Sequence, residues 1–171
     1  MSKIKLFSGM DFSGKTTIIN GINEKMPSKF SIKKKFLTPI DLIENVRKRD
    51  TWLSPEEWKP LLQENIQKDI KEYKENGLIL LDSLWIIKYL AGKIEKNDKQ
   101  DEEEIIILKE LLKKYPEMDS FYITVSMNER IKRFQARAKS GNEITGSDKL
   151  IMDTDKFERR EQIYKQIVLE Y

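Results

Sequence analysis

The sequence predicts a three-layer α/β/α fold built on a parallel sheet. Segments typical of strands alternate with segments typical of helices along all 171 residues, which is the pattern of a parallel sheet covered by helices on both faces. One strand-like segment, Leu78–Leu81, is apolar at every position, as expected for a strand buried on both faces. A chain of this length is expected to form one domain, residues 1–171, with a sheet of four or five strands.

Local signals place the individual elements. Alternating apolar residues mark the first strand, and a Ser-Pro-x-Glu sequence beginning at Ser54 marks the start of a long helix. We expect strands at Ile4–Ser8, Phe36–Thr38, Leu78–Asp82 and Phe121–Val125. We expect helices over Gly14–Lys25, Asp41–Lys48, a segment from Ser54 to Tyr73, Leu84–Lys96, Glu102–Lys114, Asn128–Lys139 and Thr154–Leu169.

The composition excludes several kinds of chemistry. The chain has no Cys and no His, so thiolate chemistry is absent and acid–base work falls to Asp, Glu, Lys or Tyr. The net charge of +3 is too small to indicate a nucleic-acid-binding protein. No signal peptide or membrane-spanning apolar run is visible. We therefore expect a cytoplasmic protein, bacterial or viral, with no membrane partner.

The segment from Gly9 to Thr16 matches the phosphate-binding pattern G-x-x-x-x-G-K-[ST] at every fixed position. It stands between a predicted strand and a predicted helix, where backbone N–H groups can surround nucleotide phosphates. The residues expected to bind the phosphates of ATP are Gly9, Phe12, Ser13, Gly14, Lys15, Thr16 and Thr17. Lys15 adds a positive charge, and Thr16 offers its hydroxyl to Mg²⁺. The alternative is a chance glycine turn before an ordinary helix.

Asp82 ends the buried third strand. Ligands of open α/β sheets gather at the carboxyl ends of the strands. There Asp82 can hold Mg²⁺ through water or accept a proton from a substrate hydroxyl. The alternative is a carboxylate that caps the next helix.

Three arginines, Arg130, Arg133 and Arg137, share one face of the predicted helix Asn128–Lys139. Guanidinium groups aimed at a migrating phosphoryl group stabilise its charge. The helix leads into a polar segment with two glycines, so a mobile lid is expected around residues 137–150. The alternative is a solvated basic face paired with Glu129 or Glu143, which is the favoured interpretation for Arg130 alone.

Two groups of acidic residues, Asp11 in the phosphate-binding segment and the run Asp101–Glu104, need an assigned role. Asp11 lies inside the phosphate-binding segment, where a carboxylate aimed at a triphosphate is unfavourable. We expect it to turn outward, toward a sugar hydroxyl or another polar group of the acceptor, or else to cap the loop. The acidic run Asp101–Glu104 is expected to be a solvated helix start.

Taken in order, these features resemble the thymidylate kinase family and its neighbours, the deoxynucleoside kinases. Phe7–Thr17 resembles the family's opening segment, Asp82 matches the end of its third strand, and the final helix around Phe157–Tyr164 is similar to the family's last helix. The resemblance implies a nucleotide-kinase-like P-loop NTPase fold and a homodimer. It implies that Asp11 contacts the sugar of the acceptor and that Arg133 and Arg137 are lid arginines.

The sequence departs from the family where the acceptor binds. Ser83 stands where the family has an arginine that binds the acceptor's phosphate, and the segment Leu61–Lys74 contains no arginine. Arg47 and Lys59 are the two candidates to replace it. The family's fifth strand, whose turn contacts adenine, has no counterpart in the sequence. Candidates for contacts with the acceptor's base are Trp58, Gln63, Gln67, Trp85 and Tyr89.

The sequence thus indicates an ATP- and Mg²⁺-dependent phosphotransferase, with Lys15, Asp82, Arg133 and Arg137 as its catalytic residues. The favoured acceptor is a deoxynucleoside monophosphate. The first alternative is a hydroxyl acceptor: a nucleoside, a modified base, including one within DNA, or another small molecule. Nucleic acid is expected only as a substrate. The second alternative is a nucleotide-binding regulatory protein without catalytic turnover.

Overall fold

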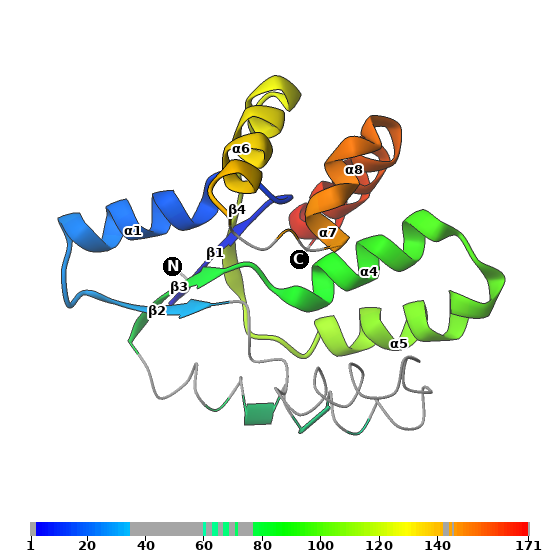
Figure 1. Ribbon diagram of the computed structural model, residues 1–171. Coiled ribbons are helices and arrows are strands. Elements are labelled where there is room, and N and C mark those ends of the chain that lie inside the picture. Colours follow the sequence, from blue (N-terminus) through cyan, green and yellow to red (C-terminus); the bar gives the residue numbers. More distant parts are fainter. Residues whose placement is uncertain are drawn as a thin grey trace.

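The computed structural model describes residues 3–34, 60, 63–64, 67–68, 71, 77–141, 144 and 146–170 (Figure 1). The strand expected at Phe36–Thr38 and the helix expected at Asp41–Lys48 lie outside these residues. Within the long helix expected after Ser54, the residues that are described, between 60 and 71, are helical.

Four parallel strands form the sheet among the described residues, in the order β2-β3-β1-β4. The strands are β1 (Ile4–Ser8), β2 (Phe30–Lys34), β3 (Leu78–Asp82) and β4 (Met118–Tyr122). The central strand β1 pairs Ile4 with Ile79 of β3 and with Met118 of β4. The predicted fold class is confirmed, and β1 and β3 lie where the sequence places them.

Helices cover both faces of the sheet (Figure 1). Helix α1 (Lys15–Lys25) packs over a small apolar cluster of Phe7, Ile19 and Leu80. The larger core on the other face joins the sheet to α4 (Trp85–Lys96), α5 (Glu102–Leu112) and α8 (Thr154–Glu170). The remaining elements are α6 (Met127–Lys139), the short helix α7 (Gly146–Lys149) and the 3-10 turns at Lys99–Asp101 and Leu150–Met152.

Two strands differ from the sequence prediction. Strand β2, at Phe30–Lys34, has no counterpart among the predicted elements, and β4 begins at Met118 instead of Phe121. The position of β4 is set by its pairing with β1, in which Lys5 lies beside Asp119 and forms an ion pair with it. The sequence does not show which strand will pair with this segment. A prediction from local apolar and β-branched residues therefore follows the run Phe121–Val125 and places the strand three residues too late.

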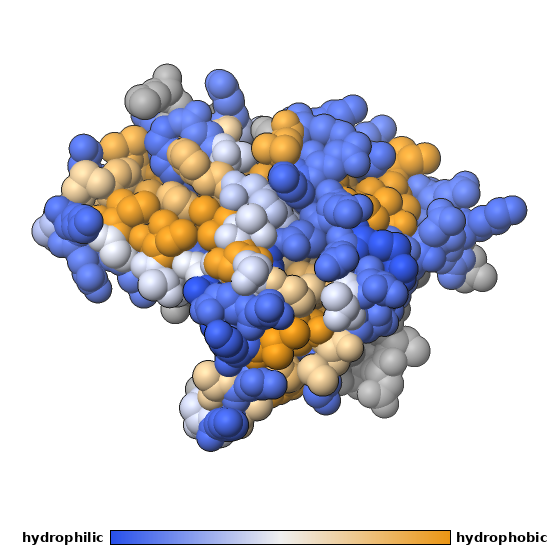
Figure 2. Space-filling view, turned by 90° about the horizontal axis from the view of Figure 1, so that it is seen from above, coloured by the Kyte–Doolittle hydropathy of each residue, from blue (hydrophilic) through white to orange (hydrophobic). Residues whose placement is uncertain are grey.

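The segment Ser140–Lys149, expected to be a loop, contains the short helix α7 (Gly146–Lys149). Seen from above, the surface is mostly hydrophilic and interrupted by separate apolar areas (Figure 2). Within the described parts of the chain, no helix combines the length and the apolar character needed to cross a membrane.

Candidate phosphate-binding and phosphoryl-transfer site

The loop between β1 and α1 has a backbone that requires glycine at two positions. Gly9 has a φ of 149°, and a Cβ there would lie 2.2 Å from the carbonyl oxygen of Ile123. Gly14 has a φ of 94° and directly precedes α1. Between them Phe12 also adopts a positive φ, 63°. This geometry places the N–H groups at the start of α1 where they can bind an anion.

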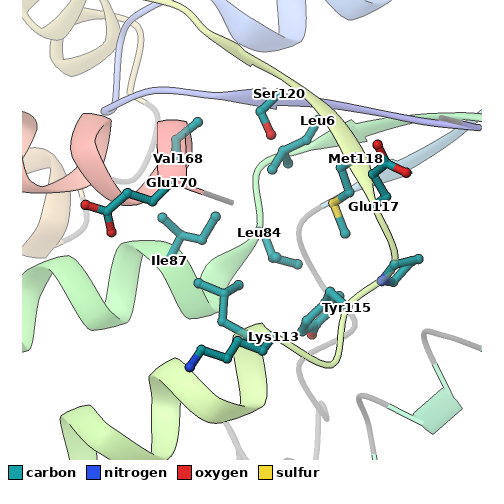
Figure 3. A pocket seen from close by; sticks show the side chains of 12 residues that line it. Leu6, Leu84, Ile87, Lys113, Tyr115, Glu117, Met118, Ser120, Val168 and Glu170 are labelled. Carbon is teal, nitrogen blue, oxygen red and sulfur yellow. The ribbon is translucent and has the colours of Figure 1, made fainter. Parts of the chain in front are cut away.

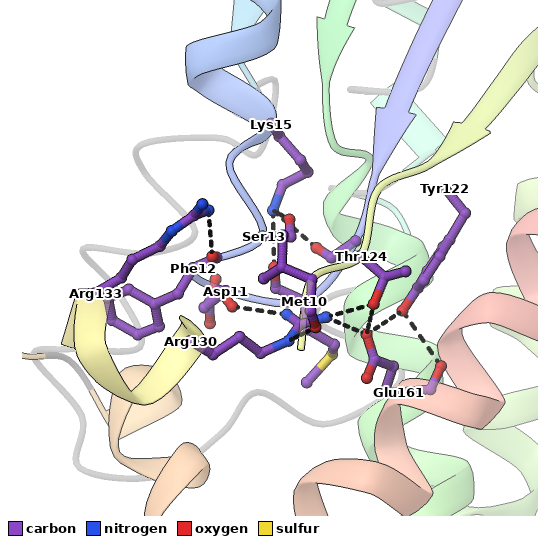
Figure 4. Close-up of polar contacts among 12 residues, drawn as sticks. Met10, Asp11, Phe12, Ser13, Lys15, Tyr122, Thr124, Arg130, Arg133 and Glu161 are labelled. Atoms are coloured by element: carbon purple, nitrogen blue, oxygen red, sulfur yellow. Dashed lines mark hydrogen bonds and ion pairs between the residues drawn. The ribbon is translucent and has the colours of Figure 1, made fainter. Parts of the chain in front are cut away.

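The ammonium group of Lys15 folds back over the loop (Figure 4). Its Nζ donates to the carbonyl oxygens of Gly9 at 2.8 Å and Met10 at 3.1 Å, and to Ser13 Oγ at 3.3 Å. The positive charge is thus held at the loop that the motif predicts to bind phosphate.

Thr16 and Asp82 meet at the carboxyl edge of the sheet. Phe7 of β1 pairs with Asp82 of β3, and the loop after β1 brings Thr16 Oγ1 to donate to Asp82 Oδ2 at 2.7 Å. Both side chains present hard oxygen atoms, which suit Mg²⁺. The described residues contain no group of three or more Asp, Glu, His or Cys side chains that could hold a metal alone. Two oxygen donors nevertheless fit Mg²⁺, since this ion usually takes its other ligands from phosphates and water.

Two of the three predicted arginines, Arg133 and Arg137, lie beside Phe12 of the loop and line the pocket over it. Arg133 donates from its NH1 to the carbonyl oxygen of Phe12 at 3.0 Å, and its Nε donates to Glu129 Oε1 at 2.7 Å. The guanidinium of Arg137 lies 6.0 Å from the centre of the Phe12 ring and 3.8 Å from Asp148 Oδ1. Both side chains are more than a third exposed, at 39% and 44%. They are therefore accessible to a ligand bound over the loop.

Arg130 behaves differently from the other two, because only 1% of it is exposed. Its polar contacts are drawn in Figure 4. Its guanidinium donates to the carbonyl oxygens of Asp11 and Val125, at 3.0 and 3.2 Å, and to Thr124 Oγ1 at 2.9 Å. It also forms an ion pair with Glu161 of α8. The interpretation of Arg130 as part of a solvated basic face is wrong: this residue connects the loop, β4 and α8 in the interior.

Glu161 also accepts hydrogen bonds from Tyr122 Oη at 3.2 Å and Thr124 Oγ1 at 3.3 Å. Burial, followed by the charge of Glu161, raises the pKa of Tyr122. The tyrosine therefore stays protonated and acts as a hydrogen-bond donor. Nothing in the sequence indicates this network, since its members come from four separate parts of the chain.

A pocket of about 930 Å³ opens over the loop. All of the predicted phosphate-binding and catalytic residues line it: Gly9, Phe12, Ser13, Gly14, Lys15, Thr16, Thr17, Asp82, Arg133 and Arg137. Asp11 lines it as well, and its carboxylate is held by Lys88 of α4, with Nζ to Oδ distances of 2.7 and 2.9 Å. Lys88 is a pocket residue that the sequence reasoning missed.

Among the residues predicted to contact the base of the acceptor, those whose side chains the structure describes do not line the pocket over the loop. Gln63 is half-buried and Gln67 is exposed, and neither lines the pocket over the loop. Arg47, Trp58 and the side chain of Trp85 lie outside the described part of the molecule. Tyr89 is half-buried on α4 and donates to Glu104 Oε1 at 2.7 Å. Ser83, directly after Asp82, lines the pocket and is 5% exposed.

A second pocket, of about 280 Å³, lies away from the loop, among the end of α5, the start of β4 and α8 (Figure 3). Its wall is largely apolar, with Leu6, Leu84 and Met118, and carries the charged groups of Lys113 and Glu170. It shares no residue with the pocket over the phosphate-binding loop.

No family model and no curated protein sequence matches the chain. Solved structures do match it. Thymidylate kinase from Candida albicans superposes with a TM-score of 0.63 at 18% identity, over 96% of this chain and 76% of that one. Deoxyadenosine kinase from M. mycoides, solved with dATP, gives 0.59 at 19% identity, over 98% and 87% of the two chains. Thymidylate kinase from Ehrlichia chaffeensis gives 0.53 at 15% identity, over 98% and 81%. The chain therefore has the P-loop fold of the thymidylate and deoxynucleoside kinases.

Proposed function

We propose that this protein is an ATP- and Mg²⁺-dependent phosphotransferase that acts on a deoxynucleoside monophosphate. The observation that carries the proposal is the 2.7 Å hydrogen bond between Thr16 and Asp82 beside the ammonium group of Lys15. It brings the two oxygen donors that suit Mg²⁺ and the cation that suits a triphosphate to one edge of the sheet.

The residues have separate roles in this reaction. The loop N–H groups and Lys15 bind the β- and γ-phosphates of ATP, and Thr16 and Asp82 hold the Mg²⁺. Bound Mg²⁺ supplies charge neutralisation to the phosphate oxygens. Arg133 and Arg137 stand over Phe12 and turn toward the transferred group, where they stabilise the charge on its equatorial oxygens. The likeness in fold to thymidylate and deoxyadenosine kinases supports this assignment.

A hydroxyl acceptor is the second candidate, because the buried side chain of Ser83 leaves no cation directly after Asp82. Asp82 would then accept the proton of the attacking hydroxyl. ADP release measured with a panel of deoxynucleosides and their monophosphates separates the two candidates. A protein that binds ATP without acceptor-dependent turnover would contradict both and favour a regulatory role.

Lys15→Ala tests the assignment of the loop. The expected result is a loss of acceptor-dependent ADP release of about 1000-fold or more, since a positioned charge at the transferred group is removed. The thermal midpoint should remain unchanged. Lys25→Ala, at the exposed end of the same helix, is the matched control and should keep full activity. Near-normal turnover by Lys15→Ala would refute the proposed function.

A further inference from the structure

Lys88 lies where two hollows of the molecule meet. The pocket over the phosphate-binding loop adjoins a smaller hollow of about 340 Å³ between α4 and α8. Lys88 lines both, and no other described residue does so. In phosphoryl transfer the attacking and leaving oxygens are roughly in line, so the acceptor approaches the γ-phosphate from the side away from ADP. A residue at the boundary of the two hollows is placed to contact both reactants.

Basic side chains make up most of the lining of the smaller hollow. Its lining consists of Lys88, Tyr89, Gly92, Lys93, Lys96 and Arg160. The carboxylates that pair with three of these cations belong to other residues: Asp11, Glu95, and the pair Asp101 and Glu104. None of these carboxylates lines the hollow. The hollow therefore offers basic side chains beside one aromatic ring, and three of these side chains must exchange or share a carboxylate partner to bind an anion. This lining suits a ligand that combines an anionic group with a planar base.

The ion pair between Lys88 and Asp11 can exchange partners. Both side chains are partly exposed, at 26% and 21%, so the pair is hydrated and weaker than a buried one. A phosphate monoester carries more charge and more acceptor oxygens than a carboxylate, so it competes well for an ammonium group. Asp11, once released from Lys88, can accept a hydrogen bond from a hydroxyl of the same ligand.

We infer that Lys88 selects an acceptor that carries a phosphate. When a nucleoside monophosphate binds in the hollow between α4 and α8, the ammonium group of Lys88 leaves Asp11 and pairs with the phosphate of that acceptor. This inference rests on the proposed function and adds the residue that distinguishes a phosphorylated acceptor from an unphosphorylated one. An oxygen of the acceptor's phosphate forms the new bond to the γ-phosphorus of ATP. The bond between that phosphorus and the bridging oxygen breaks, and its electron pair leaves with ADP.

The test compares Lys88→Met with the unaltered chain and with Lys165→Met, an exposed lysine on α8, as control. The probes are the four deoxynucleoside monophosphates and their nucleosides, and the measured quantity is the ratio of kcat/KM for monophosphate over nucleoside. Binding of dTMP and thymidine by calorimetry gives the same ratio without turnover. Lys88→Met should lower both ratios about 10- to 100-fold through the loss of one charge-assisted contact, whereas Lys165→Met should leave them unchanged.

A double variant distinguishes two possible roles of Lys88: binding the phosphate of the acceptor, or only neutralising the charge of Asp11. If Lys88 binds the acceptor, Lys88→Met combined with Asp11→Asn keeps the low ratio; if Lys88 only screens Asp11, the second substitution restores it and overturns the inference. An unaltered chain that shows no preference for monophosphates overturns it too. Failure of the proposed function looks different, because ADP release would then not depend on Lys15 for any acceptor.

Discussion

Replacing Arg130 with methionine should destabilise the protein strongly, although this arginine is expected to touch no substrate. The substitution keeps most of the side chain's apolar volume and removes a guanidinium that is 1% exposed. The carbonyl oxygens of Asp11 and Val125 would lose their donor, at about 1 kcal/mol or more each. Glu161 would lose its cation while keeping the hydrogen bonds from Tyr122 and Thr124. The expected total is about 3 kcal/mol, at the low end for breaking a buried ion pair, because Glu161 is 21% exposed.

Urea unfolding followed by circular dichroism measures this loss, and the thermal midpoint should fall by roughly 6–12 °C for a chain of this length. Adding Glu161→Gln to Arg130→Met should recover part of the stability, because it removes the carboxylate that the first change leaves unpaired. Lys132→Met, which removes an exposed cation from the same helix, serves as the control and should leave the stability nearly unchanged. A loss below about 1 kcal/mol for Arg130→Met would refute the view that this guanidinium ties the loop to the core.

Two further predictions concern motion and pH. We propose that residues 137–150 act as a lid; amide hydrogen exchange in Ser140–Lys149 should slow when an ATP analogue is added, since Arg137 gains charge-assisted contacts, and equal exchange with and without the analogue would contradict this. Burial raises the pKa of Tyr122 and Tyr164, so above about pH 10 the unfolded chain releases protons that the folded chain retains. The unfolding free energy should therefore fall progressively as the pH rises above about 10, and Tyr122→Phe should make this decrease less steep.

The parts of the fold that the sequence predicts are those that depend on local signals. The loop from Gly9 to Thr16 and the apolar run Leu78–Leu81 locate β1, α1 and β3 almost to the residue. Strand β4 is misplaced by three residues because its register depends on a partner strand more than a hundred residues away, as the separation of 114 between Lys5 and Asp119 shows. Strand β2, which mixes Lys and Ser with two apolar residues, carries too weak an alternation to be recognised.

The candidate site also has a part that local sequence signals predict and a part that they do not. The motif identifies Lys15 and Thr16, and the end of a buried strand identifies Asp82. Charged pairs that join distant elements are not visible in the sequence. The acidic run Asp101–Glu104 is expected to be solvated, yet Glu104 is only 6% exposed and both end residues of the run bind Lys93. Burial lowers the pKa of Lys93, but the hydrogen bonds that Lys93 donates to the carboxylates of Asp101 and Glu104, together with their charges, outweigh it and raise the pKa overall.

The position of Asp11 shows how the charges of the site depend on each other. A carboxylate in a phosphate-binding loop repels a triphosphate unless it turns away or is neutralised, and here Lys88 holds it at 2.7 Å. Because this pair is neutral, the positive charge of the pocket comes from Lys15, Arg133 and Arg137, opposed among the described lining residues by Asp82 alone. The end of the pocket at the loop, where we propose that ATP binds, therefore has more cationic than anionic lining residues before any ligand arrives. At the end shared with the smaller hollow, the ammonium group of Lys88 becomes available only when Lys88 leaves Asp11. An anionic acceptor can break this ion pair by replacing the carboxylate, whereas an uncharged acceptor cannot, so only the anionic acceptor gains the contact with Lys88.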